Sequence, residues 1–140
     1  MVSLRNNLTT EEIKRWSIQA AIAAEEKLGQ NTVLLDVGAL VGITDVFVIT
    51  SGSNFRQVRA IVEEIEEQML LLDGPKPQTI EGREYQEGSI WVLMDYGGFI
   101  VHVFDNETRE LYDLERLWND CPRIEWQDKS VVSKDSFRGN

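Results

Sequence analysis

Few residues in this chain have both the type and the spacing that enzyme chemistry requires. The segment Ser51-Gly52-Ser53 lies where an expected strand passes into an expected helix, a junction at which backbone N–H groups can bind phosphate. Enzymes that transfer nucleotides from such a junction also need paired carboxylates, as Asp-x-Asp, to hold Mg²⁺ ions. The sequence contains no Asp-x-Asp. A tight turn with a helix cap is therefore favoured here over a nucleotide site.

Two further candidates for chemistry are Asp95 and His102, the only histidine of the chain. We expect them as diagonal neighbours across a hairpin, close enough for a carboxylate to meet an imidazole. No Ser, Cys or Lys nucleophile is expected beside them. One histidine and one cysteine, Cys121, are too few for a structural zinc site. We therefore predict no catalytic residue, no metal and no cofactor, and assign His102 to an interface or a sheet surface.

The hairpin that positions these residues is predicted within Ser89 to Tyr112. Two apolar runs flank Gly97-Gly98, a dipeptide typical of type I′ turns, in which both central residues have positive φ. In that register Asp95 faces Ile100, and the side chains alternate between two faces. One face is entirely apolar and must be buried: Val92, Met94, Tyr96, Phe99, Val101 and Val103. The other face is mixed and suits protein contact: Trp91, Leu93, Asp95, Ile100, His102 and Phe104.

A long helix is predicted before the hairpin, from about Thr10 to Leu28. Thr9 and Glu12 form a capping box at its start, and apolar residues, mostly alanine, recur behind them at helical spacing. We expect Gly29 to be the residue that ends this helix.

Two strands and a second helix follow in the sequence. Strands are predicted at Thr32–Val37 and Thr44–Ser51, and the second is apolar on both faces, which indicates a central position in its sheet. Ser53 is the expected N-cap of a helix that runs from Asn54 to about Leu71. Its buried stripe is predicted to be Val58, Ile61, Val62, Ile65, Met69 and Leu72.

The order of these elements predicts an α/β or α+β domain with a mixed sheet of four or five strands. The segment from Thr79 to Tyr85 fits either an edge strand or a loop, and the leucine spacing that ends at Trp118 predicts one short helix or two turns. A right-handed parallel crossover is expected from the strand at Thr44, through the long helix, to the strand at Ser89.

Composition narrows the classes of function. The net charge is −10 and there is no cluster of Lys and Arg, so direct binding of nucleic acid is disfavoured and basic partners are favoured. Solubility alone explains such acidity equally well. No apolar run approaches the about 20 residues of a membrane helix and no signal peptide is evident, so we expect a cytoplasmic protein. We assign residues 1–9 to a flexible N-terminus, 10–125 to one domain and 126–140 to a disordered tail.

Two groups of segments together carry a resemblance to a known family. The first group is TDVFVITSGS at residues 44–53, followed by Arg56-Gln57-Val58 and Ala60. The second follows Glu81-Gly82 and contains WVLMDYG at 91–97, VHVF at 101–104, TRE at 108–110, YDLE at 112–115 and LW at 117–118. This ordered pattern, which covers roughly residues 10 to 125, resembles that of the ribosomal silencing factor family, also called the Iojap family.

The resemblance implies a fold and a function. Family members have a mixed sheet with helices, similar to the nucleotidyltransferase fold but without its catalytic acids, and are not known as enzymes. They bind the large ribosomal subunit through its ribosomal protein fourteen and sterically block joining with the small subunit, which lowers translation when nutrients are scarce. A role in ribosome biogenesis and formation of a homodimer are further expectations. Gly98 departs from the family pattern, in which an acidic residue commonly follows Asp-Tyr-Gly.

The partner-binding residues are predicted on the mixed face of the hairpin and at its margin. Those on the face are Trp91, Asp95, His102 and Phe104, and those at the margin are Tyr96, Glu107, Arg109 and Tyr112. The alternative is that a helix or a second copy of the chain covers this face. Two other functions stay open at this point: a nucleotide-binding enzyme, which would need the missing acid pair, and a homodimeric interaction module.

Overall fold

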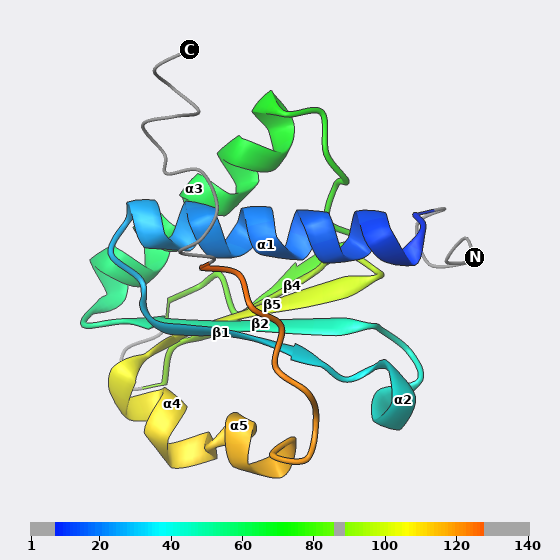
Figure 1. The fold of residues 1–140 in the computed structure, drawn as a ribbon. Helices are drawn as coiled ribbons and strands as arrows, with labels where there is room; N and C mark the ends of the chain where they lie inside the picture. Colours follow the sequence, from blue (N-terminus) through cyan, green and yellow to red (C-terminus); the bar gives the residue numbers. More distant parts are fainter. Residues whose placement is uncertain (1–7, 86–88, 128–140) are drawn as a thin grey trace.

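A computed structural model describes residues 8–85 and 89–127, so the predicted flexibility of residues 1–7 and of the tail from residue 128 lies outside the described residues. The strands are β1 (Gln30–Asp36), β2 (Val46–Gly52), β3 (Thr79–Glu81), β4 (Trp91–Asp95) and β5 (Phe99–Asp105). The helices are α1 (Thr10–Glu26), α2 (Gly38–Val41), α3 (Phe55–Leu71), α4 (Asn106–Tyr112) and α5 (Leu114–Leu117). One mixed sheet in the order β1-β2-β5-β4-β3 separates α1 and α3 from α4 and α5, which confirms the predicted α+β fold (Figure 1).

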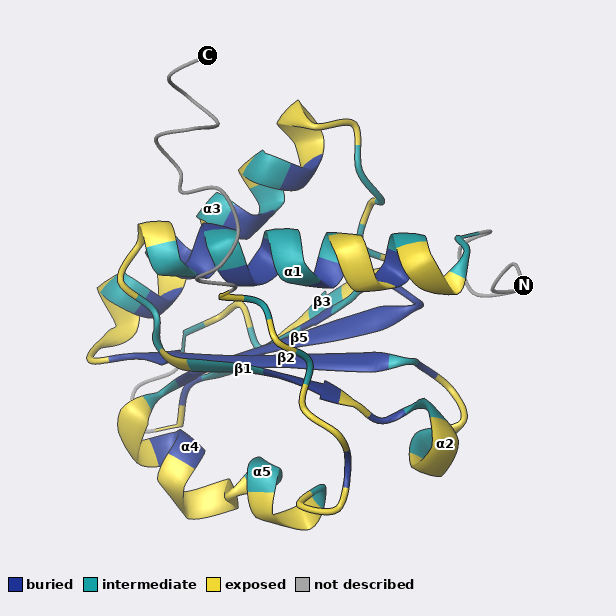
Figure 2. Cartoon of the chain, in the orientation of Figure 1, coloured by how far each residue is buried: buried dark blue, intermediate teal, exposed yellow. Residues whose placement is uncertain are grey.

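The hairpin of β4 and β5 has the register that the sequence predicts. Asp95 pairs with Ile100 and Trp91 with Phe104, in antiparallel strands. Because a slip of one residue would exchange the two faces, this register decides which side chains are buried. The whole apolar face is indeed buried: Val92, Met94, Tyr96, Phe99, Val101 and Val103. It packs in one core with α1 and α3, and the two central strands β2 and β5 are buried along most of their length (Figure 2).

The turn of this hairpin differs from the predicted type I′ turn. Gly97 has a φ of 87°, whereas Gly98 does not have positive φ. The Gly98 N–H donates to the Tyr96 carbonyl at 3.1 Å, and this bond around a residue of positive φ is the pattern of a γ-turn centred on Gly97. A Cβ at Gly98 would lie 2.6 Å from the Cδ1 and Cγ1 atoms of Ile13, so a larger residue here would require this buried side chain to move. The second glycine therefore lets α1 pack directly on the turn.

The first helix begins as predicted and ends earlier. Thr9 and Glu12 form the capping box, since the Thr9 N–H donates to the Glu12 carboxylate at 2.9 Å and the Glu12 N–H donates to the Thr9 hydroxyl at 3.1 Å. Leu28, with a φ of 62°, takes the left-handed position that was expected at Gly29. A Cβ at Gly29 would lie 2.6 Å from the Thr50 hydroxyl, so this glycine instead lets the chain pass close to β2.

The central position predicted for the strand at Thr44–Ser51 is confirmed, whereas the predicted parallel crossover is not. All residues of β2 are buried and the strand lies between β1 and β5, as its apolar pattern predicts. The predicted crossover to a parallel strand at Ser89 is wrong, because the parallel neighbour of β2 is β5 and β4 runs antiparallel to β5. The tight turn forces β4 and β5 to be antiparallel, and β5, apolar on both faces, occupies the more buried place. The ambiguous segment from Thr79 contains the short edge strand β3, which pairs with β4.

The second long helix, α3, presents the predicted stripe to the core apart from its last member. The buried residues are Val58, Ile61, Val62, Ile65 and Met69. Leu72 is the C-cap residue, which follows the last helical residue, so the regular helix that directs this stripe into the core has already ended. The residue is 49% exposed.

A segment at the C-terminal end of the described chain lies along the outer edge of β1. The Ile124 N–H donates to the Leu34 carbonyl at 2.9 Å. The indole N–H of Trp126, a residue that the sequence analysis assigned to the tail, donates to the Thr32 carbonyl at 3.0 Å. These contacts pair backbone groups that an edge strand would otherwise leave open.

Candidate functional site

The Ser51-Gly52-Ser53 junction is filled by side chains of the protein itself. The Ser53 N–H donates to the Gln57 side-chain carbonyl at 2.7 Å, and the Gln57 amide in turn donates to the Leu28 carbonyl at 2.8 Å. A Cβ at Gly52 would lie 3.1 Å from Gln57 Cβ, so the glutamine side chain covers the turn closely. The Ser51 hydroxyl is buried and accepts a hydrogen bond from Arg109 at 3.0 Å. The polar groups of the junction are thus engaged within the fold, which supports the reading as turn and cap.

The cap of α3 is Asn54, and the prediction of Ser53 is wrong by one residue. The Asn54 side-chain oxygen accepts from the Gln57 N–H at 3.0 Å, whereas the Ser53 hydroxyl accepts from the Gln30 amide on the neighbouring strand. We expect Asn54→Ala to lower the free energy of unfolding by about 1 kcal/mol and Ser53→Ala to lower it less, measured by chemical denaturation. Equal losses from the two variants would contradict this assignment of the cap.

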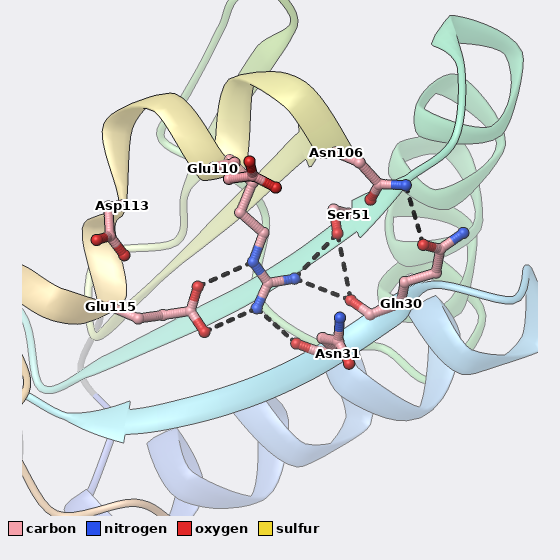
Figure 3. Close-up of a pocket in the computed structure, with 8 residues that line it drawn as sticks. Gln30, Asn31, Ser51, Asn106, Glu110, Asp113 and Glu115 are labelled. Carbon is pink, nitrogen blue, oxygen red and sulfur yellow. Dashed lines mark hydrogen bonds and ion pairs between the residues drawn. The ribbon is translucent and has the colours of Figure 1, made fainter.

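Arg109 lines an open polar pocket of about 570 Å³ at the ends of β2 and β5, together with the residues labelled in Figure 3. Its side chain makes five hydrogen bonds, as many as a guanidinium group has N–H donors. Two go to the Glu115 carboxylate, two to the carbonyls of Gln30 and Asn31, and one to the Ser51 hydroxyl. Arg109 is only 8% exposed, so it joins α4 and α5 to the start of β1 rather than extending toward solvent.

His102 and Asp95 do not form the pair that catalysis would need. The register places Leu93 opposite His102, and the Asp95 carboxylate accepts the Gly97 N–H at 2.8 Å in the turn. The Nδ1 atom of His102 accepts the indole N–H of Trp91 at 3.1 Å. Burial lowers the pKa of His102 to about 4, so the imidazole is neutral near pH 7.

A second apolar cluster covers much of the mixed face of the hairpin. The sequence analysis gave cover by a helix as the alternative to a partner contact, and α5 provides this cover. Leu114 and Trp118, from α5 and its C-cap, pack with Phe47 and Ile100 of the sheet, and Cys121 is buried among them. Phe104 is fully buried and His102 is 4% exposed. Neither residue is accessible to a partner in this structure.

The part of the mixed face that stays accessible belongs to β4 and the end of α4. Trp91, Leu93 and Asp95 are half-buried, and Tyr112 is 52% exposed. The centroid of the Trp91 ring lies 4.9 Å from that of Phe104 and 5.0 Å from that of Tyr112. We call these four residues, Trp91, Leu93, Asp95 and Tyr112, the β4 surface.

The remaining predicted contact residues lie apart from the β4 surface. Tyr96 is fully buried on the opposite face of the hairpin, where burial raises the pKa of its hydroxyl. Glu107 is exposed in the first turn of α4. Sequence reasoning placed Leu93 on the mixed face but did not select it, and it overlooked two exposed leucines of the final helices, Leu111 and Leu117. Their spacing alone did not reveal which leucines of the α4–α5 segment face the sheet.

The described residues form neither a metal centre nor a membrane-spanning helix. Within residues 8–85 and 89–127, no group of three or more His, Cys, Asp or Glu side chains is arranged to hold a metal ion. Within the same residues, no helix has the length and apolar character needed to cross a membrane.

Comparison with known proteins decides the family. A family model described as "Ribosomal silencing factor during starvation" matches residues 10–139. The chain belongs to the ribosomal silencing factor family. The family match extends over the β4 surface as well as the Ser51-Gly52-Ser53 junction, so both features are parts of a silencing-factor domain.

Curated members of the silencing factor family cover most of this chain. The ribosomal silencing factor of Bacillus subtilis is 37% identical over 103 residues, which are 74% of this chain and 84% of that protein. The silencing factor of Halalkalibacterium halodurans is 35% identical over 109 residues, covering 77% of this chain and 90% of that protein. A mouse relative named "Mitochondrial assembly of ribosomal large subunit protein 1" is 35% identical over 77 residues, or 54% of this chain and 32% of that protein.

Solved structures share the fold of this silencing-factor domain. A crystal structure from Chromobacterium violaceum matches with a TM-score of 0.67 and 25% identity, covering 93% of this chain and 99% of that chain. A crystal structure from Bacillus halodurans matches with a TM-score of 0.63 and 32% identity, covering 77% of this chain and 95% of that chain.

Proposed function

We propose that this silencing factor represses translation in the cytoplasm by binding the large ribosomal subunit. In this proposal it contacts ribosomal protein fourteen and occupies the face at which the small subunit docks, so that the two subunits cannot join when nutrients are scarce. Membership of the silencing factor family supports a function on the ribosome. The inhibition is steric and calls for no chemical step, in keeping with the filled Ser51-Gly52-Ser53 junction.

The accessible aromatic side chains of the β4 surface are the observation that supports this contact site. Protein interfaces concentrate their binding energy in a few aromatic residues, with polar and charged groups around them. Trp91 and Tyr112 lie with ring centroids 5.0 Å apart and stay accessible, and the Asp95 carboxylate lies on the same face of β4. The chain carries a net charge of −10, which favours approach to a basic ribosomal protein.

A binding experiment with purified subunits tests this surface. We expect Trp91→Ala to weaken binding to large subunits by about 2 kcal/mol, or ~30-fold, in co-sedimentation at a temperature at which circular dichroism shows the variant to be folded. Asp95→Lys should also weaken binding, and wild-type affinity should fall as salt rises. Phe104, an anchor expected from the sequence, is fully buried and unsuitable for this test.

Leu70→Ala is the matched control, because Leu70 is an exposed apolar residue of α3, on the opposite side of the sheet. This variant should bind and block subunit joining as the wild type does. If Trp91→Ala and Asp95→Lys fold normally and block joining at wild-type concentrations, the contact lies elsewhere, most simply along the edge from Glu81 to Tyr85.

Assembly of the large subunit is a second candidate function. The mouse relative that matches 54% of this chain is named for assembly of the mitochondrial large subunit. We propose that the same surface serves this role on a maturing subunit. Deleting the gene should then cause large-subunit precursors to accumulate in sucrose gradients, and a deletion strain with normal precursor levels would argue against it.

The homodimer is a separate part of the proposal, suggested by resemblance to the family. Sedimentation velocity of the free protein measures its mass directly. If a dimer forms through the β4 surface, Trp91→Ala should shift it toward monomer, whereas a dimer that persists in this variant must use another surface.

A further inference from the structure

A hydrogen bond within the protein holds the indole of Trp91 at its N–H edge. Its N–H donates to the Nδ1 atom of His102 at 3.1 Å, and His102 is 4% exposed. The N–H edge of Trp91 therefore points into the molecule. Trp91 is partly exposed, and because the single polar atom of its indole is already engaged, the ring that it offers to a partner is apolar.

The histidine is well suited to accept this bond. An indole N–H can only donate, so Nδ1 of His102 must carry a lone pair, and the neutral ring has its proton on Nε2. The ring itself is fixed by the edge of Phe47, with centroids 4.7 Å apart, and by Phe104 at 6.3 Å. The pKa of about 4, which burial causes, keeps Nδ1 free to accept near neutral pH.

Among the residues that the structure describes, no charged group contributes to the pKa shift of His102. The rings that contact it belong to Phe47 of β2, Trp91 of β4 and Phe104 of β5, and burial is the sole cause of its pKa shift. The acid on the same face of β4, Asp95, binds the Gly97 N–H instead. The Nε2 atom is buried and has no partner among the described residues.

We propose that His102 is a positioning residue for the contact with the large subunit. By accepting the indole N–H, it holds Trp91 in one orientation and leaves only the ring surface for the partner. The partner group that packs on Trp91 is then an apolar side chain or a Lys or Arg cation over the ring, not a hydrogen-bond acceptor. This inference rests on the proposed function, since it requires Trp91 to touch the subunit. Ordering the ring before binding removes a cost that the complex would otherwise carry.

Two substitutions separate the acceptor from the rest of the side chain. In His102→Asn, the amide oxygen is as many bonds from Cα as Nδ1 and can accept the indole N–H. His102→Leu fills the same space without an acceptor. We expect His102→Leu to weaken binding to purified large subunits about tenfold and His102→Asn to recover most of that loss. If His102→Leu does not fold, His102→Gln, whose amide group reaches the position of Nε2 instead, takes its place.

Hydrogen exchange of the Trp91 indole N–H reports on the hydrogen bond to His102 separately from the overall stability of the domain. We expect its ¹H–¹⁵N resonance, assigned by its loss in Trp91→Phe, to exchange slowly with solvent in the wild type and in His102→Asn. In His102→Leu the exchange should be faster. An unaltered exchange rate in His102→Leu would overturn the assignment of His102 as the group that holds the ring.

A double-mutant cycle distinguishes failure of this inference from failure of the proposed function. In the Trp91→Ala background, His102→Leu should cause no further loss of binding, because there is no indole to position. A further tenfold loss of binding in the Trp91→Ala background would overturn the positioning role alone. The same conclusion would follow if His102→Leu bound large subunits as the wild type does while its indole N–H exchanged faster. If Trp91→Ala binds large subunits as the wild type does, the proposed contact itself is wrong.

Discussion

Val101→Asp is expected to unfold the domain. Val101 is fully buried at the centre of the sheet, where its neighbours in register are Met94 on β4 and Val48 on β2. A carboxylate at this position would have no charged or hydrogen-bonding partner among these apolar side chains, and burying an unpaired charge costs several kcal/mol. Because single domains are stable by about 5–15 kcal/mol, this is a large share of the total. Circular dichroism and thermal melting of the purified variant measure the effect.

Leu111→Asp is the matched control for this prediction. It introduces the same charge in place of an aliphatic residue, but Leu111 is 77% exposed on α4. We expect its melting temperature to stay within a few degrees of the wild type, since exposed substitutions usually change stability by about 0.5 kcal/mol or less. A soluble Val101→Asp protein that melts with the wild type would mean that the register of the hairpin is wrong.

The hairpin could be predicted from the sequence because its signals are local. Alternating apolar residues fix which side chains share a face, and a two-residue glycine turn fixes which residues pair. Together these two features were sufficient to place Val92 and Val103 in the core and to pair Asp95 with Ile100. The capping box of α1 was predictable for the same reason, since it involves residues three positions apart.

The features that sequence reasoning missed depend on contacts between distant segments. Ile13 limits the space at Gly98 and Thr50 limits it at Gly29, so neither glycine is explained by its own turn alone. The parallel neighbour of β2 was misassigned because no local pattern says which of two antiparallel strands lies nearer the centre of a sheet.

The candidate site was predictable only in part, for a related reason. Residue type placed aromatic and charged side chains on one face of the hairpin but did not show that α5 would cover half of it. Trp91, Asp95 and Tyr112 stay accessible, whereas Phe104 is under this cover. Arg109 illustrates the limit most clearly, because an arginine in an acidic chain suggests a surface contact and the structure gives it an internal role.

That internal role predicts a large loss of stability in Arg109→Met. The guanidinium group binds the carbonyls of Gln30 and Asn31, where β1 departs from regular pairing with β2 and Asn31 has a φ of 48°. It also pairs with Glu115 at 2.9 Å, and the side chains of Arg109 and Glu115 are 9% and 26% exposed. Removing the arginine would leave a partly buried carboxylate and a buried Ser51 hydroxyl without this donor. Breaking one side of such a pair costs about 3–5 kcal/mol, measured by chemical denaturation.

Two comparisons make the prediction for Arg109 specific. Arg116→Met removes the same charge from an exposed position of α5 and should change the free energy of unfolding by about 0.5 kcal/mol or less. Adding Glu115→Gln to Arg109→Met should restore part of the lost stability, because the unpaired carboxylate is then gone. The folded fraction of Arg109→Met should still bind large subunits through Trp91 and Tyr112. If Arg109→Met instead melts as the wild type does and fails to bind subunits, Arg109 is a contact residue, and the hydrogen bonds around it contribute little to the fold.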